Sequence, residues 1–302
     1  MTKNVVGLSV APKVVDGLEQ ADKVSLRVYV QKKLAANVAE CPIPSTIRFG
    51  TGETVQTDVV EVGTVVPHTS SAQRERKRPL VPGLSIGHPE ITAGTLGCIV
   101  RRSTEPDGAF VLSNYHVLGD DGAAFPGDAV IQPGSADKGV VPGDIVATLE
   151  FTVPFHFDGT PCRVDAALAR IEDGEKWQND WRCFGNTIDV LCLTRLPQKS
   201  ETVYKIGRTS GLTTGTVIDP NVEAFKIDHK EPGGDKLKPV VFVDQVLCSK
   251  YADGGDSGSI VFTSDGFMVG LHMAGSEEVS VFNKIMNVVQ ELHIEFIKSE
   301  IS

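Results

Sequence analysis

The 302-residue chain is long enough for one domain of about 200 residues and a smaller one, each with a core of its own. Its formal net charge of −10 provides no broad basic surface for phosphate groups, which excludes nucleic acid as the main partner. The chain begins without a continuous apolar secretion signal, and nowhere does it reach about eighteen apolar residues in a row, so we expect a cytoplasmic protein without membrane association.

The first part of the chain predicts a small domain followed by a linker. Residues 1–63 are interpreted as an α/β domain, because residues 26–30 and 57–62 alternate as half-buried strands and residues 12–21 are compatible with a short helix. Residues 64–89 are rich in Pro, Ser, His and basic residues, which is typical of a linker.

The remainder, residues 90–302, predicts a mainly β domain. Short apolar runs recur between turn signals, which favours a sandwich or a barrel. Near the end, residues 285–292 place apolar side chains at helical spacing, with Asn283 as the expected N-cap of a C-terminal helix.

The six cysteines form no CxxC pair and show no regular spacing, so neither a zinc site nor a disulfide framework is indicated. The sequence also lacks the common signatures of nucleotide hydrolysis, zinc proteolysis and dinucleotide binding. We therefore expect no metal and no cofactor.

Residues 254–258 read Gly-Gly-Asp-Ser-Gly and form the most informative segment. A serine hydroxyl becomes a useful nucleophile when a tight turn exposes it and aims backbone N–H groups at the developing oxyanion. Glycines on both sides of Ser257 permit such a turn. The apolar runs 260–262 and 267–271 then predict a hairpin.

Two further segments supply candidate partners for the serine. His116 follows an apolar strand, a position where a lone histidine is more often structural than catalytic. Asp165 interrupts another apolar run, and a buried carboxylate needs a partner such as an imidazole N–H. Asp158 and Asp173, by contrast, lie among polar or turn residues and are interpreted as solvated.

The three segments together resemble a known family. They occur in the order His, Asp, Ser, with 49 residues from His116 to Asp165 and 92 from Asp165 to Ser257. In this order and spacing the chain resembles the chymotrypsin- and trypsin-like serine peptidases. It is similar in particular to bacterial trypsin-like proteins related to the plant Nal1 proteases, a match that also uses residues 93–98, 127–134 and 205–215.

The resemblance implies two six-stranded antiparallel β-barrels with the active site between them. It implies that Ser257 attacks the scissile carbonyl, that His116 acts as general base and then general acid, and that Asp165 stabilises the imidazolium. The backbone N–H groups of Gly255 and Ser257 would form the oxyanion hole. The implied activity is that of a serine endopeptidase acting on protein or peptide substrates.

The resemblance also suggests where the substrate side chain binds. Tyr251, six residues before the nucleophile, is expected at the base of the primary pocket, with His272 as a second pocket residue. Trypsin needs an aspartate at that position, so we expect no simple Lys/Arg preference and favour a small or apolar residue, although Asp253 keeps a basic preference open. Asp256 is expected to be held by internal hydrogen bonds or to stay mobile until a ligand orders the turn.

Two other functions remain open at this point. A protein can keep a protease fold as a catalytically silent peptide-binding or assembly module, and an esterase can use the same three residues. A homo-oligomer is also compatible with the sequence. Labelling of Ser257 by a fluorophosphonate separates an enzyme from a silent module, and a panel of peptides and esters separates the two enzymes.

Overall fold

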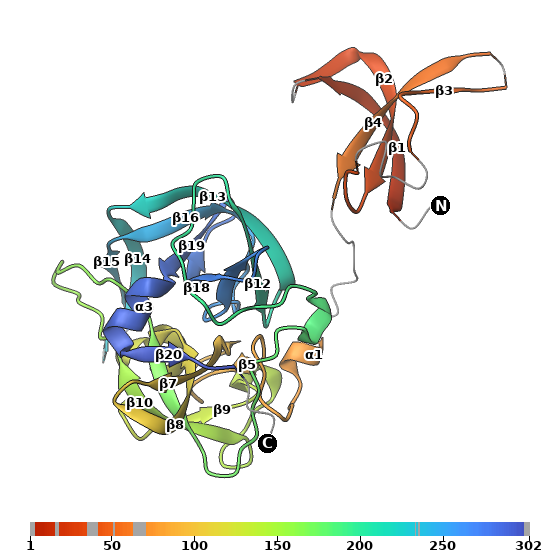
Figure 1. Ribbon diagram of the computed structural model, residues 1–302. Helices are drawn as coiled ribbons and strands as arrows, with labels where there is room; N and C mark the ends of the chain where they lie inside the picture. The colour runs from red at the N-terminus through yellow and green to blue at the C-terminus, as the bar shows by residue number, and fades with distance from the viewer. Residues whose placement is uncertain are drawn as a thin grey trace. The chain divides into compact units, whose positions relative to one another are not determined.

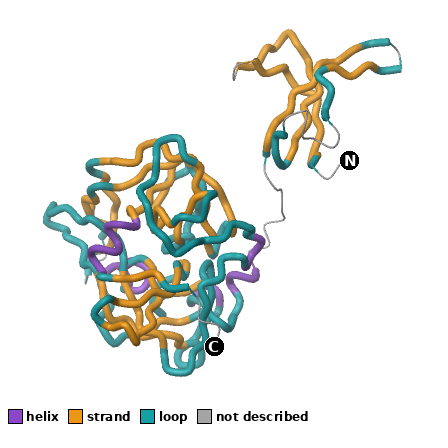
Figure 2. Tube along the Cα trace, viewed as in Figure 1, coloured by secondary structure: helices purple, strands orange, loops and turns teal. Residues whose placement is uncertain are grey.

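The computed structural model describes residues 4–15, 18–34, 42–50, 52–62, 71–232, 234 and 236–298. The chain divides into two compact units, residues 1–67 and residues 68–302, and each is considered by itself. Figure 2 shows that strands and loops make up most of both units and that the helices are short.

The first unit is a four-stranded sheet in the order β1-β2-β4-β3. Its strands are β1 (Val5–Val15), β2 (Leu18–Val30), β3 (Thr46–Arg48) and β4 (Thr54–Glu61). The two strands predicted at 26–30 and 57–62 are present and pair in parallel, Val28 opposite Val59.

The prediction of a short helix at residues 12–21 is wrong, because the described residues of this segment belong to β1 and β2. Pro12 pairs with Val24 and Lys13 with Gln20 across an antiparallel hairpin. Sheet pairing on both sides of β2 therefore overrides a weak helical pattern. Within residues 4–15, 18–34, 42–50 and 52–62 the unit contains strands and no helix, so these residues do not support its α/β interpretation.

The second unit contains a six-stranded antiparallel sheet in the order β20-β7-β8-β11-β10-β9. Five strands come from the first half of the unit and the sixth from the end of the chain: β7 (Cys98–Arg102), β8 (Glu105–Ser113), β9 (Ala129–Ile131), β10 (Ile145–Thr152), β11 (Ala167–Ile171) and β20 (Ile294–Phe296). Apolar side chains on these strands are fully buried, among them Val111, Val146 and Leu168.

The second half of this unit is a closed six-stranded barrel, β12-β13-β16-β19-β18-β17. Its strands are β12 (Thr202–Gly207), β13 (Gly211–Val222), β16 (Gln245–Ser249), β17 (Ile260–Thr263), β18 (Met268–Gly275) and β19 (Val279–Lys284). A separate hairpin, β14 (Phe225–Lys230) with β15 (Leu237–Phe242), leaves the barrel between β13 and β16. In Figure 1 the sheet and the barrel lie one below the other. The predicted mainly β architecture is confirmed.

The C-terminal helix is α3 (Ile285–Leu292), which buries Ile285, Val288 and Leu292 as its spacing predicted. The expected N-cap is wrong, because Asn283 belongs to β19 and Lys284 occupies the cap. After α3 the chain returns to the first sheet, where β20 pairs with β7 (Figure 1).

Residues 71–89 belong to the second unit. The prediction of a linker at residues 64–89 is therefore wrong for residues 71–89. A short helix, α1 (Ser71–Arg74), begins the described segment, and β5 (Ser85–Ile86) pairs with β6 (Gly94–Thr95). Leu80 and Leu84 have no exposed surface. Prolines and glycines form turns in this segment, while its apolar residues pack in the core. The composition of the segment did not indicate this burial.

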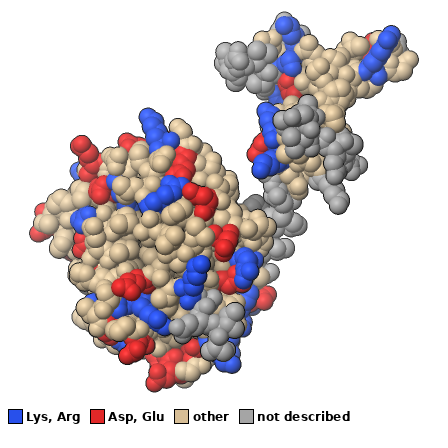
Figure 3. All heavy atoms as spheres, viewed as in Figure 1, with Lys and Arg blue, Asp and Glu red and all other residues tan. Residues whose placement is uncertain are grey.

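Figure 3 shows basic and acidic side chains interspersed over the visible face of the second unit. No helix among the described residues is long and apolar enough to cross a membrane. In the same residues, no group of three or more His, Cys, Asp or Glu side chains is arranged to hold a metal ion.

Candidate active site

Asp165 and His116 are brought together by the pairing of two neighbouring strands. His116 lies in α2 (Tyr115–Leu118), which follows β8, and Asp165 lies just before β11. Ser113 at the end of β8 pairs with Ala167 at the start of β11. Because the strands are antiparallel, the residues just beyond this pair lie at the same edge of the sheet.

The carboxylate of Asp165 is fully buried and is held by three donors. Its Oδ1 accepts the backbone N–H of Tyr115 at 2.7 Å and that of His116 at 3.2 Å. Its Oδ2 lies 2.5 Å from Nδ1 of His116. Since an ionised carboxylate can only accept, Nδ1 carries the hydrogen, and Nε2 of His116 is the nitrogen that can take up a proton.

The two groups shift each other's pKa. Burial by itself would lower the pKa of His116, but the charge of Asp165 and the hydrogen bond to it outweigh burial and raise that pKa above its ordinary value of 6.5. Burial would raise the pKa of Asp165, but the neighbouring His116 holds it below its ordinary value. The site therefore contains an ionised aspartate beside a histidine whose pKa lies above its ordinary value.

Two asparagines fix the backbone of Asp165. Asn283 accepts the N–H of Asp165 with its Oδ1 at 2.9 Å, and its Nδ2 donates to the carbonyl of Leu271 at 3.1 Å. Nδ2 of Asn114 donates to the carbonyl of Asp165 at 2.7 Å. Asn283 was expected at a helix cap and instead ties the barrel to the aspartate. Sequence pattern gave no signal for this role, because a buried asparagine in a strand looks like any polar interruption.

Ser257 lies in the turn between β16 and β17, directly before the predicted hairpin of β17 and β18. Gly255 and Gly258 have φ values of 95° and 93°, a region that side chains rarely adopt. A Cβ at Gly258 would also lie 2.0 Å from Oγ of Ser113. The glycines around Ser257 are therefore required by this turn, as the sequence predicted.

The turn lies beside the helix that carries His116. A Cβ at Gly94 would lie 2.4 Å from Cγ2 of Val117 and 3.1 Å from the carbonyl oxygen of Ser257, so both segments converge on this glycine. The half-buried Ser257 hydroxyl donates to the carbonyl of Met273 at 3.2 Å. Among the described residues it makes no hydrogen bond with His116. The structure thus joins His116 to Asp165, and the contact of Ser257 with His116 stays a prediction.

The proposed oxyanion donors are free in this part of the chain. Neither the N–H of Gly255 nor that of Ser257 donates a hydrogen bond within the described residues. The carbonyl groups of the same two residues are used: that of Gly255 accepts Oγ1 of Thr95 at 2.9 Å, and that of Ser257 accepts the N–H of Thr95 at 2.8 Å. The turn is therefore anchored through its carbonyls, which leaves its N–H groups open to a ligand.

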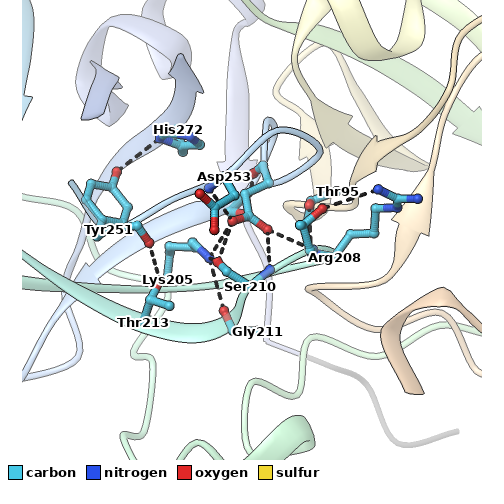
Figure 4. A network of polar contacts seen from close by, with 12 residues as sticks. Thr95, Lys205, Arg208, Ser210, Gly211, Thr213, Tyr251, Asp253 and His272 are labelled. Carbon is cyan, nitrogen blue, oxygen red and sulfur yellow. Dashed lines mark hydrogen bonds and ion pairs between the residues drawn. The ribbon is translucent and has the colours of Figure 1, made fainter. Parts of the chain in front are cut away.

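The two expected pocket residues contact each other and are almost fully buried (Figure 4). The hydroxyl of Tyr251 lies 3.2 Å from Nδ1 of His272. Burial, together with the positive charge of Lys205, lowers the pKa of His272 to about 3, and burial raises that of Tyr251. Both side chains are therefore neutral at physiological pH, and their contact with a substrate stays a prediction.

Sequence reasoning missed His229, which lies beside the His116–Asp165 pair. It comes from β14 and is buried, with its ring centroid 5.8 Å from that of His116 and 4.4 Å from that of Phe155. Its Nδ1 lies 3.0 Å from Oδ1 of Asp121, while its Nε2 is buried and has no hydrogen-bond partner among the residues that the structure describes. The residues around His229 alternate between apolar and charged side chains, which is typical of a half-exposed strand. The sequence therefore did not indicate that His229 is buried beside His116.

Comparisons with solved structures show which fold this is. No family model matches the chain, and no curated protein matches it. Thermobifida fusca protease A is similar with a TM-score of 0.50 and 16% identity, covering 72% of this chain and 98% of that protein. Nocardiopsis protease gives a TM-score of 0.50 and 15% identity over 72% and 97%.

These similarities show that the chain has the double-barrel fold of the trypsin- and chymotrypsin-like serine proteases. The finer resemblance to proteins related to the plant Nal1 proteases is not tested by them and stays a prediction.

Proposed function

We propose that this chain, with the fold of the trypsin-like serine proteases, is a serine endopeptidase that hydrolyses protein or peptide substrates through an acyl-enzyme. The observation that supports this most is the buried Asp165 bonded to Nδ1 of His116, close to the glycine-rich turn that contains Ser257. An aspartate, a histidine and a serine in these roles form the arrangement that activates a hydroxyl for acyl transfer.

The mechanism requires one local change. The Ser257 hydroxyl leaves the carbonyl of Met273 and donates to Nε2 of His116. As Ser257 Oγ forms a bond to the scissile carbonyl carbon, His116 takes its proton, and the charge of Asp165 stabilises the imidazolium. The carbonyl oxygen becomes an oxyanion that the N–H groups of Gly255 and Ser257 bind.

The tetrahedral intermediate then collapses. The C–N bond breaks, and His116 gives its proton to the leaving amine, which leaves an ester on Ser257. Water attacks this ester with His116 again acting as base, which releases the carboxylic acid and restores the serine. The chain supplies every group in this sequence, and water is the only co-reactant.

One observation favours the alternative of a catalytically silent module. The Ser257 hydroxyl is bonded to Met273 rather than to His116. If this conformation were permanent, the fold would serve only to bind a peptide. An esterase would share every catalytic residue and differ only in its substrate.

Turnover separates these functions. We expect wild-type protein to cleave a denatured protein such as casein, and the variant Ser257→Ala to lose that activity. Ser264→Ala is a matched control, because Ser264 is exposed on the turn of the neighbouring hairpin. Cleavage of p-nitrophenyl esters without any peptide cleavage would indicate the esterase. No turnover of either class would indicate the silent module.

A further inference from the structure

His229 is a buried histidine for which the proposed mechanism has no role. Its side chain is 9% exposed. Nδ1 lies 3.0 Å from Oδ1 of Asp121, and because a carboxylate can only accept, Nδ1 carries the hydrogen and donates it. Nε2 is buried and makes no hydrogen bond with any residue that the structure describes. Within the described residues, one hydrogen bond therefore holds the ring, and it goes to Asp121.

An unpaired buried nitrogen lowers stability, so packing alone does not account for a histidine at this position. The rings of Phe155 and Phe242 lie 4.4 and 5.8 Å from the ring of His229, centroid to centroid, and make its surroundings apolar. A phenylalanine or a leucine would fill the same space without leaving a polar atom unpaired. The group that distinguishes histidine from these residues, and that the structure uses, is the Nδ1–H that faces Asp121.

The hairpin that carries His229 is fixed to the first sheet at two places. Near its end, the N–H of Cys162 donates to the carbonyl of Val241 at 2.8 Å, and the carbonyl of Cys162 accepts the N–H of Val243 at 2.9 Å. At its turn, Pro232 lies against Gly122, where a Cβ would be 3.1 Å from Cγ of Pro232. The hairpin is therefore anchored to the segment before β11 and to the loop after α2, the two segments that supply the histidine–aspartate pair.

Asp121 lies in the loop directly after the helix that carries His116. Its φ is 51°, a left-handed conformation that aspartate tolerates better than most residues. Its side chain is 31% exposed, so burial alone does not keep the carboxylate turned inward. Among the described residues, the only hydrogen bond to this carboxylate comes from His229. That hydrogen bond therefore decides whether the carboxylate faces the interior or water.

The charge of Asp121 acts on the catalytic histidine. Burial lowers the pKa of His116, Asp165 raises it by its charge and its hydrogen bond, and the charge of Asp121 raises it further. A higher pKa makes the unprotonated imidazole a stronger base and stabilises the imidazolium that forms in the reaction. A carboxylate that rotated into water would lose most of this effect, because water weakens the interaction between charges. The effect of Asp121 on His116 thus depends on the hydrogen bond from His229.

We propose that His229 is a positioning residue for the reaction: its Nδ1–H holds the carboxylate of Asp121 toward His116, so that the catalytic histidine works beside two carboxylates. Asp165 bonds the histidine directly, and Asp121 acts on it without contact. The proposal deepens the proposed function and rests on it. It gives the β14–β15 hairpin a role in setting the basicity of His116.

The titratable and charged groups near this contact come from the elements packed around it: His116 and Tyr115 in α2, Asp120 in the loop after α2, Asp165 before β11, His272 in β18, and Lys230 and Lys238 on the hairpin. Burial raises the pKa of the Tyr115 phenol and lowers that of His272 to about 3, so both stay neutral while His116 titrates. Burial also raises the pKa of Asp120, which makes Asp120 the group to control for.

The test compares the wild-type full chain with Asp121→Asn, His229→Phe, His229→Asn and the double variant Asp121→Asn with His229→Phe. Asparagine keeps an N–H near the position of Nδ1 and cannot be charged, so it is the conservative replacement for His229. Asp120→Asn is the matched control for the carboxylate, because Asp120 is the preceding residue and shares the left-handed backbone. His156→Phe is the control for the ring, because His156 is exposed beside Phe155.

Two readouts follow the proton on His116. The first is the second-order rate constant for labelling of Ser257 by a fluorophosphonate between about pH 5 and 10. The second is the nuclear magnetic resonance titration of the His116 ring in a Ser257→Ala background, with its signals assigned by their loss in His116→Ala. The second readout does not depend on catalysis.

We expect Asp121→Asn and His229→Phe to lower the midpoint of both curves by about half to one pH unit. Labelling should become about two- to threefold faster at acid pH, where more His116 is unprotonated, and as much slower at alkaline pH, where the base is weaker. The double variant should shift no further than either single variant, because both changes break the same contact. His229→Asn and both controls should keep the wild-type midpoint.

A purely structural role for His229 predicts slower labelling of His229→Phe at every pH with an unchanged midpoint, and that result would overturn the proposal. Additive shifts in the double variant would also overturn it, because His229 and Asp121 would then act independently. If His229→Phe does not fold, His229→Leu removes the same N–H with a smaller side chain and should shift the midpoint equally. An unlabelled wild type whose His116 titration still depends on Asp121 and His229 would refute the protease function and leave their effect on His116 standing.

Discussion

Replacing Asp165 by asparagine should stop catalysis while leaving the fold in place. Asparagine has the same shape, and its Oδ1 can still accept the N–H groups that now lie 2.7 and 3.2 Å from the carboxylate. Its NH₂ group then faces Nδ1 of His116 in place of Oδ2. Two donors cannot share that contact, so the imidazole must move its hydrogen to Nε2, where it can no longer accept the proton of Ser257.

The size of the effect follows from losing the correct tautomer. An aspartate-to-asparagine change in a serine-protease triad costs about 10⁴ in turnover, which corresponds to about 5 kcal/mol in the activation free energy. The free energy of unfolding should fall by only about 1–3 kcal/mol, because the amide keeps the two backbone hydrogen bonds and its NH₂ group can donate to Nδ1 in the changed tautomer. Both quantities can be measured, by casein hydrolysis and by thermal melting.

Asp173→Asn is the control for this substitution, since Asp173 is exposed in the loop after β11. It should leave the rate of casein hydrolysis and the melting temperature unchanged. If folded Asp165→Asn retained turnover within about threefold of wild type, Asp165 would not set the tautomer of His116, and the mechanism derived from this geometry would be wrong.

Three further predictions concern pH, the oxyanion turn and specificity. Because the pKa of His116 is raised, kcat/KM should rise with pH through a midpoint above 6.5, and Asp121→Asn should move that midpoint down; an unchanged midpoint in pH-rate profiles would contradict the contribution of Asp121. Gly255→Ala places a Cβ 2.5 Å from Oγ1 of Thr209 and should slow fluorophosphonate labelling by about 10²–10³, whereas Gly254→Ala, with open space around it, should not; equal rates would rule out Gly255 as an oxyanion donor. The resemblance implies that Tyr251, which is neutral, takes the position of trypsin's aspartate; on this hypothesis a positional-scanning peptide library should favour small or apolar residues at the cleaved position, and dominance of Arg and Lys would overturn it.

The sequence predicted the part of the site that depends on local patterns. Alternating apolar runs located the strands on which His116 and Asp165 depend, and glycines located the turn of Ser257. These signals lie within a few residues of the functional group. For the same reason the hairpin after Ser257 was found, as β17 and β18, although β18 continues to Gly275, beyond the predicted end at residue 271.

What the sequence did not reveal depends on contacts between distant segments. Lys205 meets Asp256 across 51 residues, and Asn283 meets Asp165 across 118. A single lysine in a strand pattern normally indicates an exposed face, and only the closed barrel shows that Lys205 points inward. Leu80 and Leu84 were hidden in a similar way, because the prolines around them resembled a linker while tertiary packing buried them.

The central claim is that Ser257 is a nucleophile activated by His116, and covalent capture tests it most directly. The full chain is treated with a fluorophosphonate, its intact mass is measured, and the modified peptide is sequenced by mass spectrometry. We predict one adduct per chain, located on Ser257, absent from Ser257→Ala and formed far more slowly by His116→Ala. An unmodified wild-type chain, or an adduct that persists in Ser257→Ala, would contradict the account.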